Sequence, residues 1–292
     1  MLVDIIVTTY KRADILPDTI KRVQAQTYSD WRCWIAEDGQ TDETRSAIAP
    51  FLKDERFIYF PGDHAGRPAA PRNRAMRRGQ GYLIAFLDDD DLWLPEKLAR
   101  QVEFMRRHPA CVLLGCNAFP VGPGEEPSAE KQLYFKKKSF FGHIHYDKFV
   151  QRNYIILSSS MIRRHVVSQA GGFNERLSPA EDYEYWLRIG ALGEIWNLSE
   201  PLVIFLEAAS AKHYPTFERR ESYRQRARVL DLALSGDGTV PSPLLLPGKE
   251  TYADACRFEK KFYLKGPRIL GRLRHELAWK IRSCLLRGNQ GR

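Results

Sequence analysis

One stretch decides the fold of this 292-residue chain: Gly81-Tyr82-Leu83-Ile84-Ala85-Phe86-Leu87-Asp88-Asp89-Asp90-Asp91-Leu92-Trp93-Leu94-Pro95. Its first part, Tyr82 to Leu87, is an apolar run of the length expected for a strand buried on both faces. Four consecutive carboxylates follow this strand. In open α/β sheets ligands bind beyond the carboxyl ends of the strands, and carboxylates bind hard cations such as Mg²⁺. The alternative is a solvated acidic turn before a helix that starts near Pro95, where carboxylates complement the helix dipole.

The segments before this stretch predict a mainly parallel α/β sheet. β-branched residues dominate a first strand, Val3 to Tyr10, which a polar turn and a helix follow. A second strand, Trp31 to Ala36, ends in a turn whose Thr41 or Asp42 is suited to cap the next helix. A third strand is expected at Phe57 to Phe60. Strands that alternate with helices indicate βαβ units and parallel pairing.

Composition limits the class of protein. Hydrophobic residues make up 43% of the chain and aromatic residues 12%, which is enough for a real core. The five cysteines include no C-x-x-C pair, so neither a zinc ribbon nor a disulfide framework is expected, and a reducing, cytoplasmic compartment fits best. The chain has no recognisable signal peptide and no apolar run of about 18 residues, so we expect no membrane span.

The net charge of +9 is concentrated in residues 260–292, which contain ten basic residues and one acidic residue, Glu276. Apolar residues recur there at steps of three and four, which places them on one helical face: Leu270, Leu273, Leu277, Ile281 and Cys284. We expect a basic amphipathic helix that attaches to an anionic membrane surface at its cytoplasmic side. The alternative is a stripe that packs on the catalytic domain with solvated charges. Nucleic-acid binding is not expected, because no recognised nucleic-acid module accompanies the charge.

Seven short motifs occur, one after another, in the first two thirds of the chain. They are Val7-Thr8-Thr9-Tyr10, Glu37-Asp38-Gly39-Gln40-Thr41-Asp42, Arg72-Asn73, Leu87-Asp88-Asp89-Asp90-Asp91 with Trp93 and Pro95, Ser158-Ser159-Ser160, Gly171-Gly172-Phe173 and Glu181-Asp182-Tyr183-Glu184-Tyr185-Trp186-Leu187-Arg188. In this order they resemble the family 2 glycosyltransferases of the GT-A fold, over about residues 2–206. The resemblance implies a GT-A domain at 1–215, made of a Rossmann-like nucleotide-sugar-binding half at 1–95 and an acceptor half at 96–215. A helical basic appendage at 216–292 completes the predicted organisation.

The resemblance assigns a donor nucleotide site. It implies that Asp38 and Tyr10 contact uridine, that Thr8 helps to form this pocket, and that Arg72 belongs to the same site. Asp38 is suited to accept a hydrogen bond from a pyrimidine N–H, and Tyr10 to stack on the ring. Without the other motifs, Asp38 is equally typical of an Asp-Gly turn, and Tyr10 of an aromatic residue packed at a strand end.

The resemblance also implies that Asp88-Asp89-Asp90 is the D-x-D motif. Asp90 then binds Mn²⁺ or Mg²⁺ between the donor's two phosphates, and Asp88 reaches the ribose or a metal-bound water. Asp89 fills the variable place, and Asp91 supports the cluster without touching the ligand. An Arg-x-His element of the family is replaced here by Leu206-Glu207-Ala208, so His213 is a candidate substitute at the metal, although a lone His is more often structural.

The pair Glu181-Asp182 opens a predicted helix, where acidic residues ordinarily complement the dipole. The resemblance implies instead that Asp182 is the general base and that Glu181 places it. Arg67, Arg74, Arg77 and Arg78, around the loop Gly62 to Arg74, are expected to be solvated surface charges. The run Lys136–Lys138 is either part of a site for an anionic acceptor or a solvated face.

These expectations predict an inverting, metal-dependent glycosyltransferase. It takes a sugar from a nucleoside diphosphate, most simply UDP, and adds it to a hydroxyl of a glycan or lipid-linked acceptor. Two alternatives are a catalytically silent nucleotide-sugar-binding scaffold and a Mg²⁺-dependent phosphohydrolase. The intact Asp182 and acidic cluster argue against the scaffold, and the nucleotide-pocket motifs at Tyr10 and Asp38 argue against the phosphohydrolase.

Overall fold

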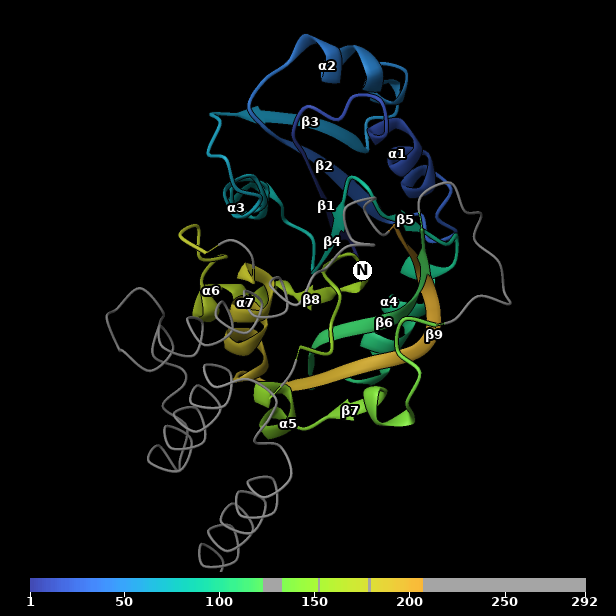
Figure 1. Ribbon diagram of the computed structural model, residues 1–292, viewed down its shortest axis with the longest axis vertical. Helices are drawn as coiled ribbons and strands as arrows, with labels where there is room; N and C mark the ends of the chain where they lie inside the picture. Colours follow the sequence, from blue (N-terminus) through green and yellow to red (C-terminus); the bar gives the residue numbers. More distant parts are fainter. Residues whose placement is uncertain (123–132, 152, 178–179, 207–292) are drawn as a thin grey trace, which may run out of the picture. The chain divides into compact units, whose positions relative to one another are not determined.

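The computed structural model describes residues 1–122, 133–151, 153–177 and 180–206 (Figure 1). The strands are β1 (Val3–Thr9), β2 (Trp31–Asp38), β3 (Phe57–Gly62), β4 (Leu83–Asp88), β5 (Leu92–Trp93), β6 (Cys111–Val121), β7 (Gly142–Ile144), β8 (Met161–Arg163) and β9 (Glu194–Leu206). The α-helices are α1 (Leu16–Gln24), α2 (Asp42–Ile48), α3 (Ala69–Arg78), α4 (Lys97–Arg107), α5 (Tyr146–Gln151), α6 (Val167–Ala170) and α7 (Glu181–Gly190). Short 3₁₀ helices occur at Phe51–Lys53, Lys138–Phe140, Leu157–Ser159 and Arg164–Val166.

All the strands belong to one sheet, in which the order β3-β2-β1-β4-β8-β6-β9-β5 runs across the molecule and β7 pairs with β9. β3, β2, β1 and β4 are parallel, and β6 is parallel to β9. Short antiparallel strands join these two parts, because β8 pairs with both β4 and β6. The predicted mainly parallel α/β sheet flanked by helices is therefore confirmed, and the structure adds the antiparallel strands β5, β7 and β8, which were not predicted.

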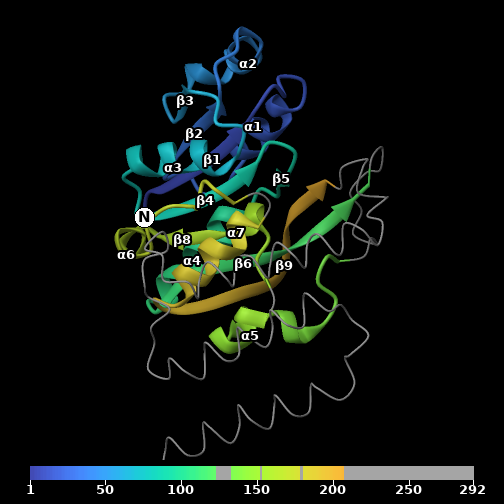
Figure 2. The same cartoon turned by 60° about the vertical axis from the view of Figure 1, so that its left-hand side comes forward.

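The sheet lies between two layers of helices (Figures 1 and 2). On one face, Val3, Ile5 and Val7 of β1 pack with the apolar sides of α1 and α4. On the other face, Phe86 of β4 contacts the rings of Phe173 and of Trp186 in α7. The parity of β4 therefore directs its last residue, at position 88, toward the layer that contains α3 and α7.

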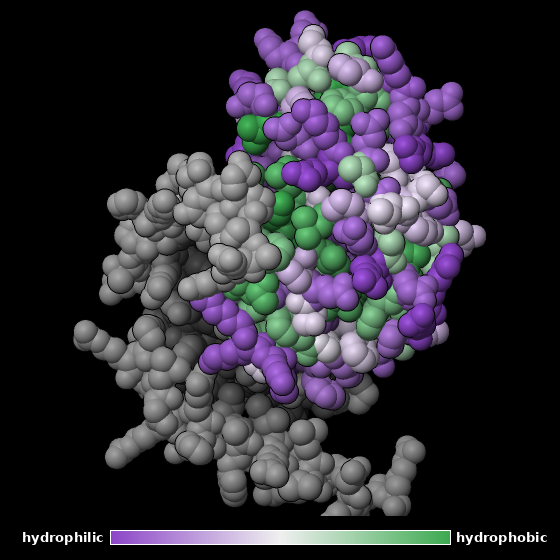
Figure 3. All heavy atoms as spheres, turned by 90° about the vertical axis from the view of Figure 1, so that its right-hand side faces the viewer, coloured by the Kyte–Doolittle hydropathy of each residue, from purple (hydrophilic) through white to green (hydrophobic). Residues whose placement is uncertain are grey.

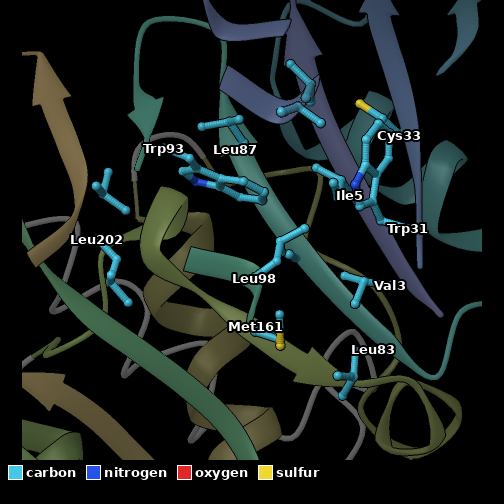
Figure 4. Close-up of a cluster of buried hydrophobic side chains, with 14 of the residues drawn as sticks. Val3, Ile5, Trp31, Cys33, Leu83, Leu87, Trp93, Leu98, Met161 and Leu202 are labelled. Atoms are coloured by element: carbon cyan, nitrogen blue, oxygen red, sulfur yellow. The ribbon is translucent and has the colours of Figure 1, made fainter. Parts of the chain in front are cut away.

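The core that fixes this register is one cluster of buried apolar side chains from both parts of the sheet (Figure 4). Trp93 of β5 is fully buried in it and donates its indole N–H to the carbonyl of Ser158 at 2.7 Å. Burying such a ring contributes roughly 2–3 kcal/mol and requires a partner for its N–H, and Ser158 provides that partner. The surface is different: on the face shown in Figure 3, hydrophilic side chains predominate and apolar ones are gathered mainly in its central part.

Several local predictions are revised by the structure. The central strand begins at Leu83, and Tyr82 is 71% exposed, so the strand is shifted by one residue from the predicted run. The next helix begins at Lys97 rather than Pro95, after the short strand β5.

The cap of α2 is as predicted, since Thr41 Oγ1 accepts the backbone N–H of Thr44.

Some predictions fall outside the described residues. These are the boundary at 215/216, the helical basic appendage at 216–292, the membrane-attachment stripe within 260–292, and His213. In the described ranges, no helix has the length and hydropathy needed to cross a membrane. Cys33, Cys111 and Cys116 are buried free thiols.

Candidate functional site

A cavity of about 590 Å³ opens at the carboxyl ends of β1, β2 and β4. It is lined by side chains of both charges, together with the loop that precedes α3. Every described residue predicted for the nucleotide or metal lines it, and so does the first residue of α7: Thr8, Tyr10, Asp38, Arg72, Asp88, Asp90 and Glu181. Asp182 is not among the lining residues. The motifs that were separate in sequence therefore converge on one place, apart from Asp182, which lies beside it.

Arg72, in the first turn of α3, connects two parts of this site. Its Nη2 donates to Asp88 Oδ1 at 2.7 Å, and its Nη1 donates to Glu181 Oε1 at 2.8 Å. The guanidinium is nearly completely buried. Burial alone lowers the pKa of Arg72, but the carboxylates of Asp88 and Glu181 outweigh it and the net shift of the pKa is upward. Arg72 is therefore a permanent cation that links the end of β4 to the start of α7.

Arg12 provides a second cation at the acidic cluster. Its Nη1 lies 2.6 Å from Asp90 Oδ2 and 3.1 Å from Asp89 Oδ1. The side chain is 45% exposed, so this contact is open to solvent and less constrained than that of Arg72. In the sequence, Arg12 lies two positions after Tyr10, in the polar turn that follows the first strand, and the sequence predicts no role for it in the site.

Asp89 and Asp91 are buried, and Asp88 is half-buried. Burial raises the pKa of Asp89 to about 6, and one of its oxygens, Oδ2, is buried without a hydrogen-bond partner among the described residues. Burial also raises the pKa of Asp88, against the opposing effect of Arg72, and raises that of Asp91 well above its usual range. Asp91 Oδ1 accepts the backbone N–H of Leu206 at 3.1 Å, so Asp91 holds the end of β9 next to the cluster.

These observations fit a hard divalent cation that completes its coordination with a ligand. Asp88, Asp89 and Asp90 present carboxylate oxygens to the cavity, and the buried Oδ2 of Asp89 has no hydrogen-bond partner in the described part of the chain, although Arg12 contacts the other oxygen, Oδ1. Within the described ranges, no three His, Cys, Asp or Glu side chains form a ready-made metal cage. Mg²⁺ needs only one or two carboxylates when phosphates and water supply its other ligands. The oxygen donors are therefore suitable for Mn²⁺ or Mg²⁺ that binds together with a diphosphate.

The predicted base pocket is closed by the loop after β3. Asp38 Oδ1 and Oδ2 accept the backbone N–H groups of Ala65 and Gly66 at 2.7 and 2.8 Å. The ring of His64 stacks on Tyr10 with centroids 4.3 Å apart, and its Nδ1 lies 3.1 Å from the Asp38 carboxylate. One face of the Tyr10 ring is thus covered, so a nucleobase that stacks on that face must displace His64.

Asp182 occupies a different environment from the residues of the cavity. Its Oδ2 accepts a hydrogen bond from Asn153 Nδ2 at 3.1 Å. Burial, and then the neighbouring charge of Glu181, raise the pKa of Asp182 to about 6. The preceding residue, Ala180, has φ +84°, a left-handed conformation that is strained for a residue with a Cβ. A carboxyl with such a pKa is suited to accept a proton near neutral pH.

Two other motifs build the frame of the site. Asn73, next to Arg72, accepts the N–H of Phe173 at 2.7 Å and donates to its carbonyl at 2.9 Å. A Cβ on Gly172 would come within 2.5 Å of Asn73 Oδ1, so only glycine allows this approach. Ser158 Oγ accepts the N–H of Asp88 at 3.1 Å and thereby fixes the backbone at the start of the acidic cluster.

One prediction about the arginines is wrong. Arg74 is half-buried and donates to the carbonyls of Glu37 and Asp63, whereas Arg67, which also donates to the carbonyl of Arg176, is exposed as expected, and so are Arg77 and Arg78. Sequence reasoning also missed Arg12, His64 and Asn153 as members of the site or its surroundings. In the sequence these three residues lie in turns and loops near the motifs. Nothing there distinguishes them from ordinary polar residues.

Residues 4–170 match the family described as Glycosyl transferase family 2. Two relatives from Escherichia coli are named UDP-Glc:alpha-D-GlcNAc-diphosphoundecaprenol beta-1,3-glucosyltransferase. WfgD is 32% identical over 114 residues, which cover 39% of this chain and 45% of that protein. WfaP is 36% identical over 104 residues, which cover 36% of this chain and 41% of that protein. The matched stretch therefore spans less than half the length of either relative.

Solved structures share the fold at low sequence identity. The S. aureus TarS 1–349 structure in complex with UDP-GlcNAc has a TM-score of 0.67 and 16% identity, and the match covers 93% of this chain and 75% of that one. A mannosyltransferase from Pyrobaculum calidifontis in complex with GDP-Man and Mn²⁺ has a TM-score of 0.61 and 18% identity, over 97% and 79% of the two chains. These matches show a common GT-A-like architecture.

Proposed function

The chain belongs to glycosyl transferase family 2, and we propose that it transfers a sugar from UDP to a hydroxyl of a glycan or lipid-linked acceptor. One observation carries this proposal: Arg72 is paired at once with Asp88, at the predicted nucleotide site, and with Glu181, next to the predicted base. A binding site and a proton acceptor are thus joined by a single buried side chain. The names of the two E. coli relatives, which specify UDP-Glc and a diphosphoundecaprenol-linked sugar, support the donor and the acceptor class.

The donor nucleotide is assigned to the cavity. Asp38 is placed to accept the N–H of a uracil, Tyr10 to contact its ring, and Thr8 to border the pocket. Since His64 and the N–H groups of residues 65 and 66 already contact Tyr10 and Asp38, the loop after β3 rearranges when the base enters.

The diphosphate is assigned to the acidic cluster together with Mn²⁺ or Mg²⁺. Asp90 is the proposed ligand of the cation, and Asp88 contacts the ribose or contributes to the same site. When bound, the cation neutralises the charge that develops on the leaving diphosphate. Arg12 and Arg72 provide fixed positive charge on either side of the cluster.

Asp182 is the proposed general base, and Glu181 the residue that places it. Asp182 takes the proton from the acceptor hydroxyl while that oxygen forms its bond to the anomeric carbon. The bond from this carbon to the diphosphate oxygen breaks at the same time, so UDP leaves and the configuration is inverted. The pKa of Asp182, about 6, keeps the carboxyl mostly ionised at neutral pH and still basic enough for this step.

Transfer assays test the proposal against its alternatives. The purified protein is incubated with a panel of nucleotide sugars, Mn²⁺ or Mg²⁺, and lipid-linked or glycan acceptors, and the products are identified by mass spectrometry. Transfer that depends on UDP-sugar and on the acceptor is the expected result. Tight UDP-sugar binding without transfer supports the scaffold, and release of inorganic phosphate from simple phosphate esters supports the phosphohydrolase.

A further inference from the structure

The side chain of Asn153 is fixed in one orientation by two hydrogen bonds. Its Oδ1 accepts the backbone N–H of Ile155 at 3.0 Å, and its Nδ2 donates to Asp182 Oδ2 at 3.1 Å. The N–H of Ile155 can only donate, so it requires the oxygen of the amide. The NH₂ end must then face Asp182.

The segment that bears Asn153 is itself anchored. The carbonyl of Tyr154 accepts a hydrogen bond from Nδ2 of Asn197 in β9 at 3.2 Å. Ile155 is buried, and a Cβ on Gly115 of β6 would come within 2.6 Å of its Cδ1. The segment that bears the amide donor is therefore supported by β6 and β9.

We propose that Asn153 is a positioning residue for Asp182, whose amide N–H fixes one carboxylate oxygen and favours the ionised form. This inference rests on the proposed role of Asp182 as the base. A hydrogen bond to the charged form stabilises that form, and it directs the second oxygen, Oδ1, to the acceptor hydroxyl.

Within the described residues, three charged groups have the largest effects on Asp182, and they belong to α7, β4 and α3. Glu181, on the same helix, and Asp88, at the end of β4, disfavour the ionised form, whereas Arg72 of α3 favours it. Asn153 is neutral, so it contributes without adding charge to a site that already has two further carboxylates. An acidic residue at position 153 would reverse its effect, because it would add a carboxylate within hydrogen-bond distance of Asp182 to the charges of Glu181 and Asp88.

The chain offers a matched pair of substitutions to test this. Asn174 makes the same local contact as Asn153, since its Oδ1 accepts the N–H of Arg176 at 3.0 Å, but its amide has no contact with Asp182. In both Asn153→Asp and Asn174→Asp, one oxygen keeps the backbone contact. Only the first places a carboxylate against Asp182. Asn153→Ser is a third variant that removes the donor without adding charge.

The readout is the protonation of Asp182 itself, measured by ¹³C NMR on full-length protein with ¹³Cγ-labelled aspartate. The resonance is assigned by its absence in Asp182→Asn. We expect its titration to move upward by about one pH unit or more in Asn153→Asp, to move less in Asn153→Ser, and to stay unchanged in Asn174→Asp. The acidic limb of kcat for UDP-sugar transfer shifts in parallel, while UDP affinity is retained.

An unmoved Asp182 titration in folded Asn153→Asp, or an equal shift in Asn174→Asp, overturns the inference. This outcome is independent of turnover. If the titration shifts as expected but no donor gives transfer, the positioning contact stands and the proposed reaction fails. If transfer occurs but the titration of Asp182 is unmoved in Asn153→Asp, the proposed reaction stands and the positioning role of Asn153 fails.

Discussion

Arg12 Nη1 lies 2.6 Å from Asp90 Oδ2, the carboxylate proposed to bind the metal ion. A cation that approaches Asp90 therefore meets a positive charge already in place, and a diphosphate that arrives with the cation meets a favourable one. The same guanidinium opposes one component of the donor complex and favours the other. Separate measurement of metal and nucleotide binding distinguishes the two effects.

Arg12→Met is expected to change these affinities in opposite directions. Two unit charges about 4 Å apart interact by about 1 kcal/mol in a water-like medium, and a divalent ion doubles this, so Mn²⁺ alone should bind about thirtyfold more tightly. UDP in saturating Mn²⁺ should bind more weakly. Calorimetry measures both, and Arg12→Lys, which keeps the charge, is the control. A weaker affinity for Mn²⁺ alone would contradict the assignment.

Asp90→Ala is expected to abolish the metal-dependent part of donor binding. Without this carboxylate the cation loses its proposed protein ligand, so adding Mn²⁺ should no longer strengthen UDP binding. Removal of metal from the wild-type protein with EDTA should have the same effect. If Mn²⁺ still strengthened UDP binding to the variant by the same factor, the metal ligand would be another residue of the cluster.

Asp182→Asn is expected to slow transfer by roughly a hundredfold to ten-thousandfold, the usual contribution of a general base, without loss of UDP affinity. In the wild-type protein, kcat should fall as the pH drops below about 6, because the carboxyl is then protonated. Steady-state kinetics across pH checks both statements. Near-normal turnover of the variant would exclude Asp182 as the base.

The same substitution is expected to stabilise the fold at neutral pH. The folded pKa of Asp182, about 6, is above the unfolded value near 4, so the folded state binds the proton more tightly. Stability from this group is present below pH 4 and is lost as the pH rises through 6. Asp182→Asn should therefore raise the unfolding free energy by about 1 kcal/mol at pH 8 and by less at pH 4. Thermal unfolding of the wild-type protein and the variant at the two pH values is the measurement. An equal gain in unfolding free energy at both would contradict a raised pKa of Asp182 in the folded state.

The basic stripe of residues 260–292 remains a proposal about membrane attachment. Each Lys or Arg near an anionic surface contributes about 1 kcal/mol, so the full chain should sediment with anionic liposomes at low salt. A chain that ends near Phe258 should stay in solution, and neutral liposomes should bind neither. Equal sedimentation of both chains would exclude this role.

The residues at the strand ends could be predicted from the sequence, because the apolar pattern of each strand shows where it ends. Once the strands at Val3 and Leu83 are placed in parallel, Thr8 and Asp88 become neighbours at the same edge, and the structure pairs their Cα positions. The capping contact at Thr41 is local in sequence and was predicted for the same reason.

Contacts between distant segments were not accessible. The pairing of Arg12 with Asp90 spans 78 residues, and its geometry depends on the turn after β1. The stack of His64 on Tyr10 depends on how the loop after β3 folds back over Asp38. Neither has a periodic pattern in the sequence, because each is decided by tertiary packing between irregular segments.

The bridge formed by Arg72 also has a consequence for synthesis of the chain. Glu181 follows Arg72 by 109 residues, which a ribosome adds in about 5–20 s. During this interval the nascent guanidinium has Asp88 within reach but lacks its second carboxylate, and β4 lacks β8, its neighbour at Ile84. The first 95 residues are thus expected to remain bound by chaperones or partly open until α7 has emerged, so the nucleotide-binding half completes its folding only when the acceptor half arrives.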